Sequence, residues 1–321
     1  GANTTGTENV AMGTLAGDAL TTGSYNTAIG YDSLSVATTA NDNTAVGREA
    51  LRDTTSGTDN TAVGKEAGKL NTTGDKNTAV GTHALNVNTT GTYNVAVGAY
   101  SLTANTTASH NTAVGESAGE LITEGFANTM LGRAAGNATT TGDYIICIGY
   151  ATDASSATAN NQIVMGDSVT GNAANSFCFG TGSTDSAIGF GATSITAPSD
   201  VRLKEDIQDE VVGLDFINEL RPVTFRWKKA KDVPPEMKVH DPDSEERVMD
   251  GKYNHGFIAQ EVKEVIDNNP DIKDGFDIWS EDETDGRQRI GEGALVPMLT
   301  KAIQELSAKV EVLEKQLNNK E

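Results

Sequence analysis

The chain of 321 residues has few aromatic side chains, little cysteine and a shortage of positive charge. Aromatic residues make up 5% of the sequence, and the only cysteines, Cys147 and Cys178, each lie in a short apolar run. Two thiols placed in this way predict buried, free cysteines rather than a disulfide framework or a reactive site. No apolar run approaches the roughly 18 residues that a membrane-spanning helix needs, so we expect no membrane insertion.

Positive charge is scarce in both halves of the chain. Residues 1–198 carry 6 basic and 16 acidic side chains (net −10), and residues 199–321 carry 18 and 29 (net −11). This balance argues against binding to nucleic acid or to an anionic membrane surface. The four histidines lack metal-ligand spacing and no phosphate-binding loop is present, so we expect neither a metal nor a cofactor. The chain starts with Gly-Ala and has no signal-peptide pattern, so we expect a fragment of a longer protein.

A 17-residue repeat rich in Gly, Asn, Thr and Ala dominates the first part of the chain. Each copy opens with Asn-Thr-Ala-Val-Gly or a variant of it, and Gly holds the fifth position in all ten copies. The copies begin at Asn9, Asn26, Asn43, Asn60, Asn77, Asn94, Asn111, Asn128, Ile145 and Gln162. This unit is too short for a helical hairpin, and Gly, Asn and Thr are poor helix formers. The spacing therefore predicts a parallel β-solenoid over residues 1–180, followed by a linker at 181–198.

Within each coil, the pattern predicts two short strands with small and aliphatic side chains directed inward. The third position is usually Ala (Ala45), the fourth is aliphatic (Val46), and a second small residue follows five positions after the Ala (Ala50). Stacking should place the Asn side chains in a column, in which amides bond along the axis. Because the core of each coil is thin, we expect the solenoid to pack against copies of itself as a trimer.

These repeats resemble the heads of trimeric autotransporter (YadA-like) adhesins, in which three left-handed parallel β-rolls pack around an axis. The resemblance covers roughly residues 1–170, although the 17-residue coil is a few residues longer than is typical of those heads. An ice-binding solenoid is an alternative, suggested by the threonines that follow each Asn, such as Thr44 and Thr61. That column is a single file rather than a broad Thr array, which disfavours this alternative. A thermal-hysteresis assay would test it.

Residues 199–321 have a different character, with both tryptophans and mixed helix and strand patterns. Residues 211–220 have apolar positions at helical spacing, residues 221–227 alternate as a strand, and residues 255–266 begin as a strand or turn and continue as a helix. The predicted fold class is therefore mainly β, then α+β. A parallel β-roll or solenoid precedes a mixed α/β domain whose C-terminal helix forms a coiled coil from about residue 295.

The chain ends in an apolar heptad with steps of 4, 3, 4, 3 and 4, which is typical of a self-association helix. This seam consists of Leu299, Ile303, Leu306, Val310, Leu313 and Leu317. β-Branched residues alternating with Leu favour two strands in an isolated parallel coiled coil. The rest of the architecture favours three, so we expect a homotrimer.

The C-terminal part resembles the intramolecular chaperone and auto-peptidase domain of phage tail fibres and tailspikes, the endosialidase-type chaperone. The segments that carry the resemblance are S-D-V-R-L-K-E-D-I at Ser199, G-L-D-F-I-N-E-L-R-P-V-T-F-R-W at Gly213, H-G-F-I-A-Q-E-V at His255 and A-L-V-P-M-L-T-K-A-I-Q-E-L at Ala294. The resemblance implies a tail-fibre or appendage fragment of a virion, whose last domain drives trimerisation and folding and then cuts itself off. The solenoid would meet a host cell-surface receptor, for example a glycan, and the released domain would stay in the host cytoplasm.

By its position in this resemblance, Ser199 is the nucleophile and Lys204 the base of a single-turnover serine peptidase that cuts between Pro198 and Ser199. A serine needs a base to take its proton, and a lysine serves only when deprotonated, which burial or a nearby cation such as Arg202 promotes. At a spacing of five residues, neither a helix nor a strand brings the two side chains together. Either a turn intervenes, therefore, or the lysine comes from another subunit. His255 is a further candidate for a supporting role, although a structural role is the simpler interpretation.

The alternative function is that of a bacterial trimeric surface adhesin, with a C-terminal trimerisation domain that does not cleave. The chaperone-like segments favour the phage interpretation. A gel of freshly expressed protein distinguishes the two, because only an auto-peptidase yields fragments that meet at residue 199.

Overall fold

The chain folds into two compact units, Gly1–Leu203 and Lys204–Glu321. The computed structural model describes residues 3–182, 184–192, 195, 199, 201–237, 239–249, 251–269, 272, 278–281, 286 and 288–319. The division falls a few residues after the predicted start of the C-terminal domain at residue 199.

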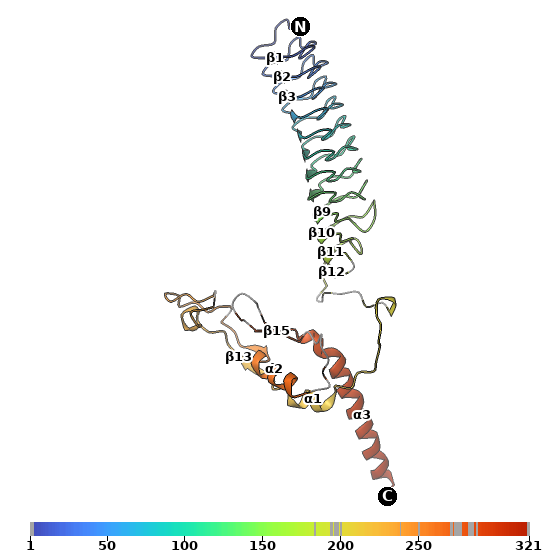
Figure 1. The fold of residues 1–321 in the computed structure, drawn as a ribbon, viewed down its shortest axis with the longest axis vertical. Helices are drawn as coiled ribbons and strands as arrows, with labels where there is room; N and C mark the ends of the chain where they lie inside the picture. Colours follow the sequence, from blue (N-terminus) through green and yellow to red (C-terminus); the bar gives the residue numbers. More distant parts are fainter. Residues whose placement is uncertain are drawn as a thin grey trace. The chain divides into compact units, whose positions relative to one another are not determined.

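The first unit is a β-solenoid, whose coils stack along one axis (Figure 1). Twelve strands form one sheet in sequence order, and all neighbouring pairs are parallel except β11 and β12. The strands are β1 (Val10–Met12), β2 (Thr27–Ile29), β3 (Thr44–Val46), β4 (Thr61–Val63), β5 (Thr78–Val80), β6 (Val95–Val97), β7 (Thr112–Val114), β8 (Thr129–Leu131), β9 (Ile145–Tyr150), β10 (Gln162–Asp167), β11 (Ser176–Thr181) and β12 (Thr184–Gly189). The sheet thus continues into residues 181–198, which the sequence predicts as a linker, and ends there on an antiparallel strand.

Each repeat coil from β1 to β8 contains one strand in the described structure, so the prediction of two strands per coil is wrong. After the strand, the backbone turns through left-handed residues such as Glu49 (φ 57°) and Leu51 (φ 48°). These turns still bond to neighbouring coils: the N–H of Glu49 donates to the carbonyl of Tyr31 at 2.9 Å, and the N–H of Leu51 donates to that of Ala67 at 3.0 Å. Hydrogen bonds from coil to coil therefore satisfy the turns without the extended backbone of a second strand.

In each strand from β2 to β8, only the middle residue is buried in the core. In β3, Ala45 is fully buried, whereas Thr44 and Val46 on either side of it are partly exposed. The prediction that the aliphatic fourth position points inward is therefore wrong. Successive residues of a strand point to opposite faces, so threonines and aliphatic residues form two adjacent columns on the outer face of the sheet. The second small residue, Ala50, is buried as predicted.

The predicted asparagine column is confirmed, and it bonds to the backbone as well as to neighbouring amides. Oδ1 of Asn43 accepts the backbone N–H of Asn60 at 3.0 Å, and Oδ1 of Asn60 accepts that of Asn77 at 2.9 Å. The side-chain amide of Asn60 donates to Oδ1 of Asn43 at 3.1 Å and to the carbonyl of Gly74 at 2.8 Å. These buried amides therefore tie each coil to its neighbours on both sides.

The glycine that closes each repeat motif is required for two reasons. Gly47 has φ 137°, which side chains rarely adopt, and a Cβ there would lie 2.4 Å from the carbonyl oxygen of Gly64 in the next coil. Cys147 and Cys178 are free and buried, as predicted. Burial raises the pKa of the Cys147 thiol to about 12, which keeps this thiol protonated and unreactive.

The second unit is a mixed α/β domain, and the predicted fold class is confirmed. Its helices are α1 (Leu214–Glu219), α2 (Ala259–Asn268) and α3 (Val296–Asn318), with short 3₁₀ turns η2 (Ala230–Asp232) and η3 (Glu292–Leu295). Its antiparallel strand pairs are β13 (Val223–Phe225) with β14 (Asn254–Gly256), and β15 (Trp279–Glu281) with β16 (Gln288–Ile290). Phe216, Val262, Ile278, Leu295 and Met298 belong to one hydrophobic core, so α1, α2 and the start of α3 pack together.

Candidate functional site

The predicted dyad lies where the solenoid unit gives way to the C-terminal unit along the chain. Ser199 comes just before η1 (Val201–Leu203) in the first unit, and Lys204 is the first residue of the second. Ser199, Arg202 and Lys204 are exposed in the single chain, so solvent reaches all three side chains. Pro198, on the other side of the predicted scissile bond, lies outside the described residues. The pairing of Ser199 with Lys204 stays a prediction.

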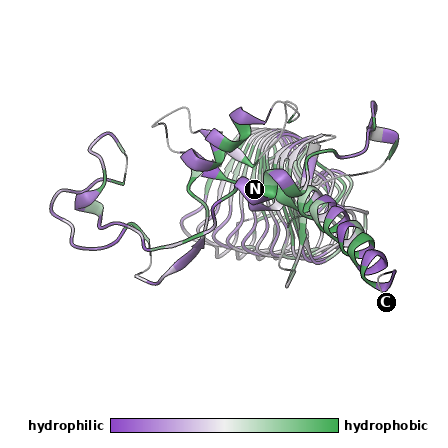
Figure 2. Ribbon diagram, turned by 90° about the horizontal axis from the view of Figure 1, so that it is seen from below, coloured by the Kyte–Doolittle hydropathy of each residue, from purple (hydrophilic) through white to green (hydrophobic). Residues whose placement is uncertain are grey.

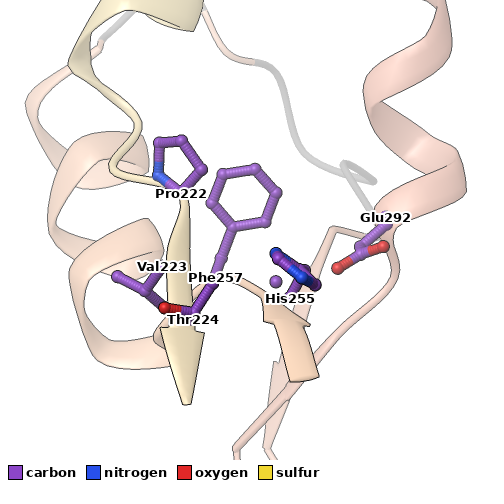
Figure 3. Close-up of a pocket in the computed structure, with 7 residues that line it drawn as sticks. Pro222, Val223, Thr224, His255, Phe257 and Glu292 are labelled. Atoms are coloured by element: carbon purple, nitrogen blue, oxygen red, sulfur yellow. The ribbon is translucent and has the colours of Figure 1, made fainter. Parts of the chain in front are cut away.

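His255 lines a pocket within the second unit. The pocket has a volume of about 450 Å³ and is lined by Pro222, Val223, Thr224, His255, Gly256, Phe257 and Glu292. His255 on β14 lies opposite Thr224 on β13 in the strand register. Figure 3 shows the imidazole and the carboxylate of Glu292 at the same side of the pocket. An imidazole and a carboxylate thus line the same pocket, and the supporting role of His255 stays a prediction.

Glu292 is the carboxylate of this pocket, and the sequence did not predict it as a site residue. It comes from η3, distant in sequence from His255, and its Oε1 lies 3.2 Å from the position that a Cβ on Gly256 would occupy. The glycine at 256 therefore leaves room for this carboxylate beside β14. No periodicity links residues 255 and 292, so only the fold could reveal their proximity.

The helix α3 has two different faces. Met298 and Ala302 are buried and face the core of the second unit. The six seam residues are all exposed, from 41% at Leu299 to 67% at Ile303. Figure 2 shows both hydrophobic and hydrophilic colour along this helix. In a single chain, the apolar seam therefore lies in water, as expected of a helix that associates with other helices.

Glu305 connects this helix to α1. The helix α1 begins after Gly213, which has no side chain to cap it, and Oε2 of Glu305 accepts the backbone N–H of Leu214 at 2.9 Å. A carboxylate at a helix N-terminus accepts a hydrogen bond from an otherwise unpaired N–H, and its negative charge interacts favourably with the positive end of the helix dipole. The sequence indicated Glu305 only as a charge beside the seam, because a cap supplied from so far along the chain leaves no local pattern.

Within the described residues, no cluster of three or more His, Cys, Asp or Glu side chains is arranged to hold a metal ion. None of the helices in that part of the chain is both long enough and apolar enough to span a membrane.

A comparison with known families decides what this part of the chain resembles. Residues 199–269 match the chaperone of endosialidase. This endosialidase-chaperone segment starts at Ser199 itself and includes α1, β13, β14 and α2. The family is a peptidase family, so the match implies a self-cleaving peptidase domain, and it supports an intramolecular chaperone of the kind carried by phage tail fibres. Searches of curated proteins and of solved structures found no match to the chain.

Proposed function

We propose that this chain is part of a phage tail fibre or a related host-attachment appendage of a virion. The solenoid is its shaft or head and meets a host cell-surface receptor. The C-terminal domain drives trimerisation and folding and then releases itself into the host cytoplasm by cleavage before Ser199. The observation that carries the proposal is the position of the family match, which begins at Ser199, where the β-solenoid has ended.

Trimerisation is supported by two apolar surfaces that a single chain leaves uncovered. One is the seam of α3, described above. The other is the outer face of the solenoid sheet, where residues such as Val63 (38% exposed) and Leu131 (46% exposed) follow one another at the spacing of the coils. Packing of copies through both surfaces would remove this apolar area from water.

The cleavage chemistry uses the hydroxyl of Ser199 and the amine of Lys204. The Ser199 oxygen attacks the carbonyl carbon of Pro198 while the amine of Lys204 accepts the hydroxyl proton. The C–N bond then breaks, the proton passes to the departing α-amine of Ser199, and water hydrolyses the resulting ester. Arg202 is a nearby cation in the sequence that would favour the neutral form of the amine.

Assembly before cleavage would explain how the exposed Lys204 comes to act as a base. A lysine serves as a base only in its neutral form, which burial favours. Lys204 is exposed in the single chain. We propose that neighbouring subunits cover it in the trimer, which makes cutting conditional on assembly. A dyad shared between subunits is testable, because mixing Ser199→Ala chains with Lys204→Ala chains before assembly would then restore some cutting.

A gel of the freshly expressed chain tests the proposal. We expect two fragments that meet at residue 199, and a single uncut band for Ser199→Ala. Lys204→Arg keeps the positive charge but cannot lose its proton near neutral pH, so we expect it to be uncut as well. Ser280→Ala, which alters an exposed serine elsewhere in the second unit, should be cut like the wild type.

Two outcomes would contradict this proposal. A Ser199→Ala chain that is still cut at the same bond would show that another group, or a contaminating protease, does the chemistry. A wild-type trimer that remains whole would favour the alternative function, a bacterial surface adhesin with a C-terminal domain that trimerises without cleaving.

A further inference from the structure

The outer face of the solenoid sheet changes in character along its length. In each strand from β2 to β11, two side chains flank a buried one and lie on this outer face. In β3, β4, β5 and β7 the two are a threonine and a valine. In β9, β10 and β11 they are large and apolar, and we call this group the end patch: Ile146, Ile148, Ile163, Met165, Phe177 and Phe179.

The strand register gathers the end patch into one surface. Each of its two residues on β10 lies between the equivalent residues of β9 and β11. The rings of Phe177 and Phe179 have their centroids 5.0 Å apart and are tilted by 35°. None of the six side chains is buried in the single chain, and Met165 is 38% exposed. A contiguous apolar surface therefore lies in contact with water.

The coil itself does not require such large residues at these positions. The core of the same three strands is formed by Cys147, Val164 and Cys178, which are fully buried and face the other way. Coils such as that of β4 place Thr61 and Val63 at the outward positions and still bond to both neighbouring strands. The size of the end patch therefore points to a contact outside its own coil.

We propose that the end patch is the surface through which the solenoids of neighbouring copies hold together, and that it keeps them joined after the C-terminal domain has left. This inference rests on the proposed function, in which the chain trimerises and then cuts itself. Burying isoleucine, methionine and phenylalanine removes more apolar area from water than burying threonine and valine. The contact between copies is therefore strongest at this end of the solenoid.

Two features of the solenoid favour a second copy as the occupant of this face. The outward columns continue from the end patch through every coil to β2 at the strand spacing of about 4.8 Å. A second solenoid has the same axial repeat, so it stays in step with these columns over many coils. In addition, residues 1–198 carry a net charge of −10, so copies repel each other at their acidic surfaces. The flanking pairs from β2 to β11 contain no charged residue, which makes this face the one where copies approach at least cost.

The end patch also distinguishes one alignment of parallel copies from the others. Among the threonine and valine pairs, a slip of one coil exchanges like for like. At the end patch, the same slip would place Phe177 and Phe179 opposite the smaller side chains of β10 instead of opposite phenylalanines. Contacts at this end thus depend on register, whereas those of the repeat barely do.

Matched aspartate substitutions in the full chain test the position of the contact. Met165 and Val63 occupy the same outward column and are both 38% exposed. We expect the solenoid fragment released by cleavage to sediment as a trimer in the wild type and in Val63→Asp. The Met165→Asp fragment should be a monomer at the same concentration, because a carboxylate would be buried in the strongest contact. A trimeric Met165→Asp fragment, or equal dissociation of the two variants, would overturn the proposal.

Cross-linking of the full chain tests the occupant without relying on cleavage or on a disruptive substitution. Cys147 and Cys178 are buried, so a Met165→Cys chain offers one accessible thiol to a short bismaleimide. We expect covalent dimers of Met165→Cys, and none of Glu116→Cys, whose side chain is 58% exposed on a turn outside the sheet. A Met165→Cys chain that stays uncoupled would refute a second copy as the occupant and favour another cover, such as the C-terminal unit. Dimers in a chain that is never cut at residue 199 would instead refute the proposed peptidase and leave the end patch as the contact between copies.

Discussion

The two units of this chain differ in how far their side chains find partners within a single chain. In the solenoid, each coil bonds to its neighbours through strands, turns and a buried column of asparagines such as Asn60. In the second unit, α3 buries Met298 and Ala302 but leaves the whole apolar seam exposed. Each coil of the solenoid is therefore held to the next by hydrogen bonds within one chain, whereas the seam of the second unit is an exposed apolar helix face that a further copy could cover.

This difference gives a physical reason for placing a chaperone after a repeat. A slip of 17 residues between two solenoids replaces most contacts with nearly identical ones, so the repeat by itself specifies register weakly. The seam of α3 has only six residues, so a slip of one heptad would lose a much larger share of its contacts than a slip of one coil loses in the solenoid. A domain that trimerises first would thus align three chains before their repeats associate, after which it is no longer needed.

Leu306→Asp should have the largest effect, because it tests the exposed seam directly. We expect loss of the trimer and of cleavage at residue 199, since assembly would bring three carboxylates together in an apolar seam. Native mass measurement and a gel check both. Val312→Asp is the control, because Val312 is similarly exposed (53%, against 51% for Leu306) but lies outside the seam. If Leu306→Asp trimerised and cut normally, the seam would not be the assembly surface.

Asn60→Ala should destabilise the solenoid, because it removes one member of the buried asparagine column. The change leaves the N–H of Asn77 without the partner described above and removes one of the two side-chain amides that donate to the carbonyl of Gly74, at a cost of about 2–4 kcal/mol in the free energy of unfolding. Thermal or denaturant unfolding followed by circular dichroism measures it. Asp59→Asn, at the exposed residue before it, should change stability by less than about 0.5 kcal/mol. Equal losses in the two variants would contradict a special role for the buried column.

Lys69→Met removes a positive charge that pairs with carboxylates on two coils of the solenoid, and its effect on the stability of the solenoid should depend on pH. Nζ of Lys69 lies 2.7 Å from Oε2 of Glu49 and 3.3 Å from Oε2 of Glu66, on successive coils. The hydrogen bond from Lys69 holds the pKa of Glu49 below its usual value of 4.5. Because the folded-state pKa is lowered, this stabilisation is present above pH 4.5 and is lost as the pH falls through the folded value.

We therefore expect Lys69→Met to destabilise the solenoid by about 1–2 kcal/mol at neutral pH, and by progressively less below pH 4.5. Chemical unfolding at a series of pH values measures the difference from the wild type. Lys65→Met is the control, because Lys65 is 49% exposed and 3.5 Å from Glu66. A difference that did not shrink in acid would show that packing rather than charge accounts for the effect.

Glu305→Ala should have the smallest effect, and it concerns the second unit alone. Loss of the cap on α1 should lower the stability of that unit by about 1 kcal/mol. Glu305→Gln keeps an oxygen that can accept the N–H of Leu214, so it should retain most of that stability. Hydrogen exchange at the amide of Leu214 reports the cap itself. Slow exchange that persisted in Glu305→Ala would show that the cap does not protect this amide.

Much of the architecture could be read from the sequence because a strict period leaves little freedom. Ten glycines at a step of 17 residues require ten equivalent backbone positions, and only stacked coils provide them. The apolar spacing likewise predicted α1, α2 and α3 and the strand β13. The serine and lysine were identified by the match of a whole segment to a family, not by their spacing, which fits no regular element.

What the sequence determined by itself, then, was the solenoid, the three helices and the strand β13 of the second unit, and the apolar seam, because each of these is a periodic pattern. Only the tertiary structure decided which side of the strand faced inward. Val46 is more apolar than Ala45, but the interior of a coil this narrow accepts the smaller side chain, so the aliphatic column faces out. Nor could the sequence place Glu305 on α1 or Glu292 beside Gly256. Such contacts join residues that are neighbours only after the chain has folded.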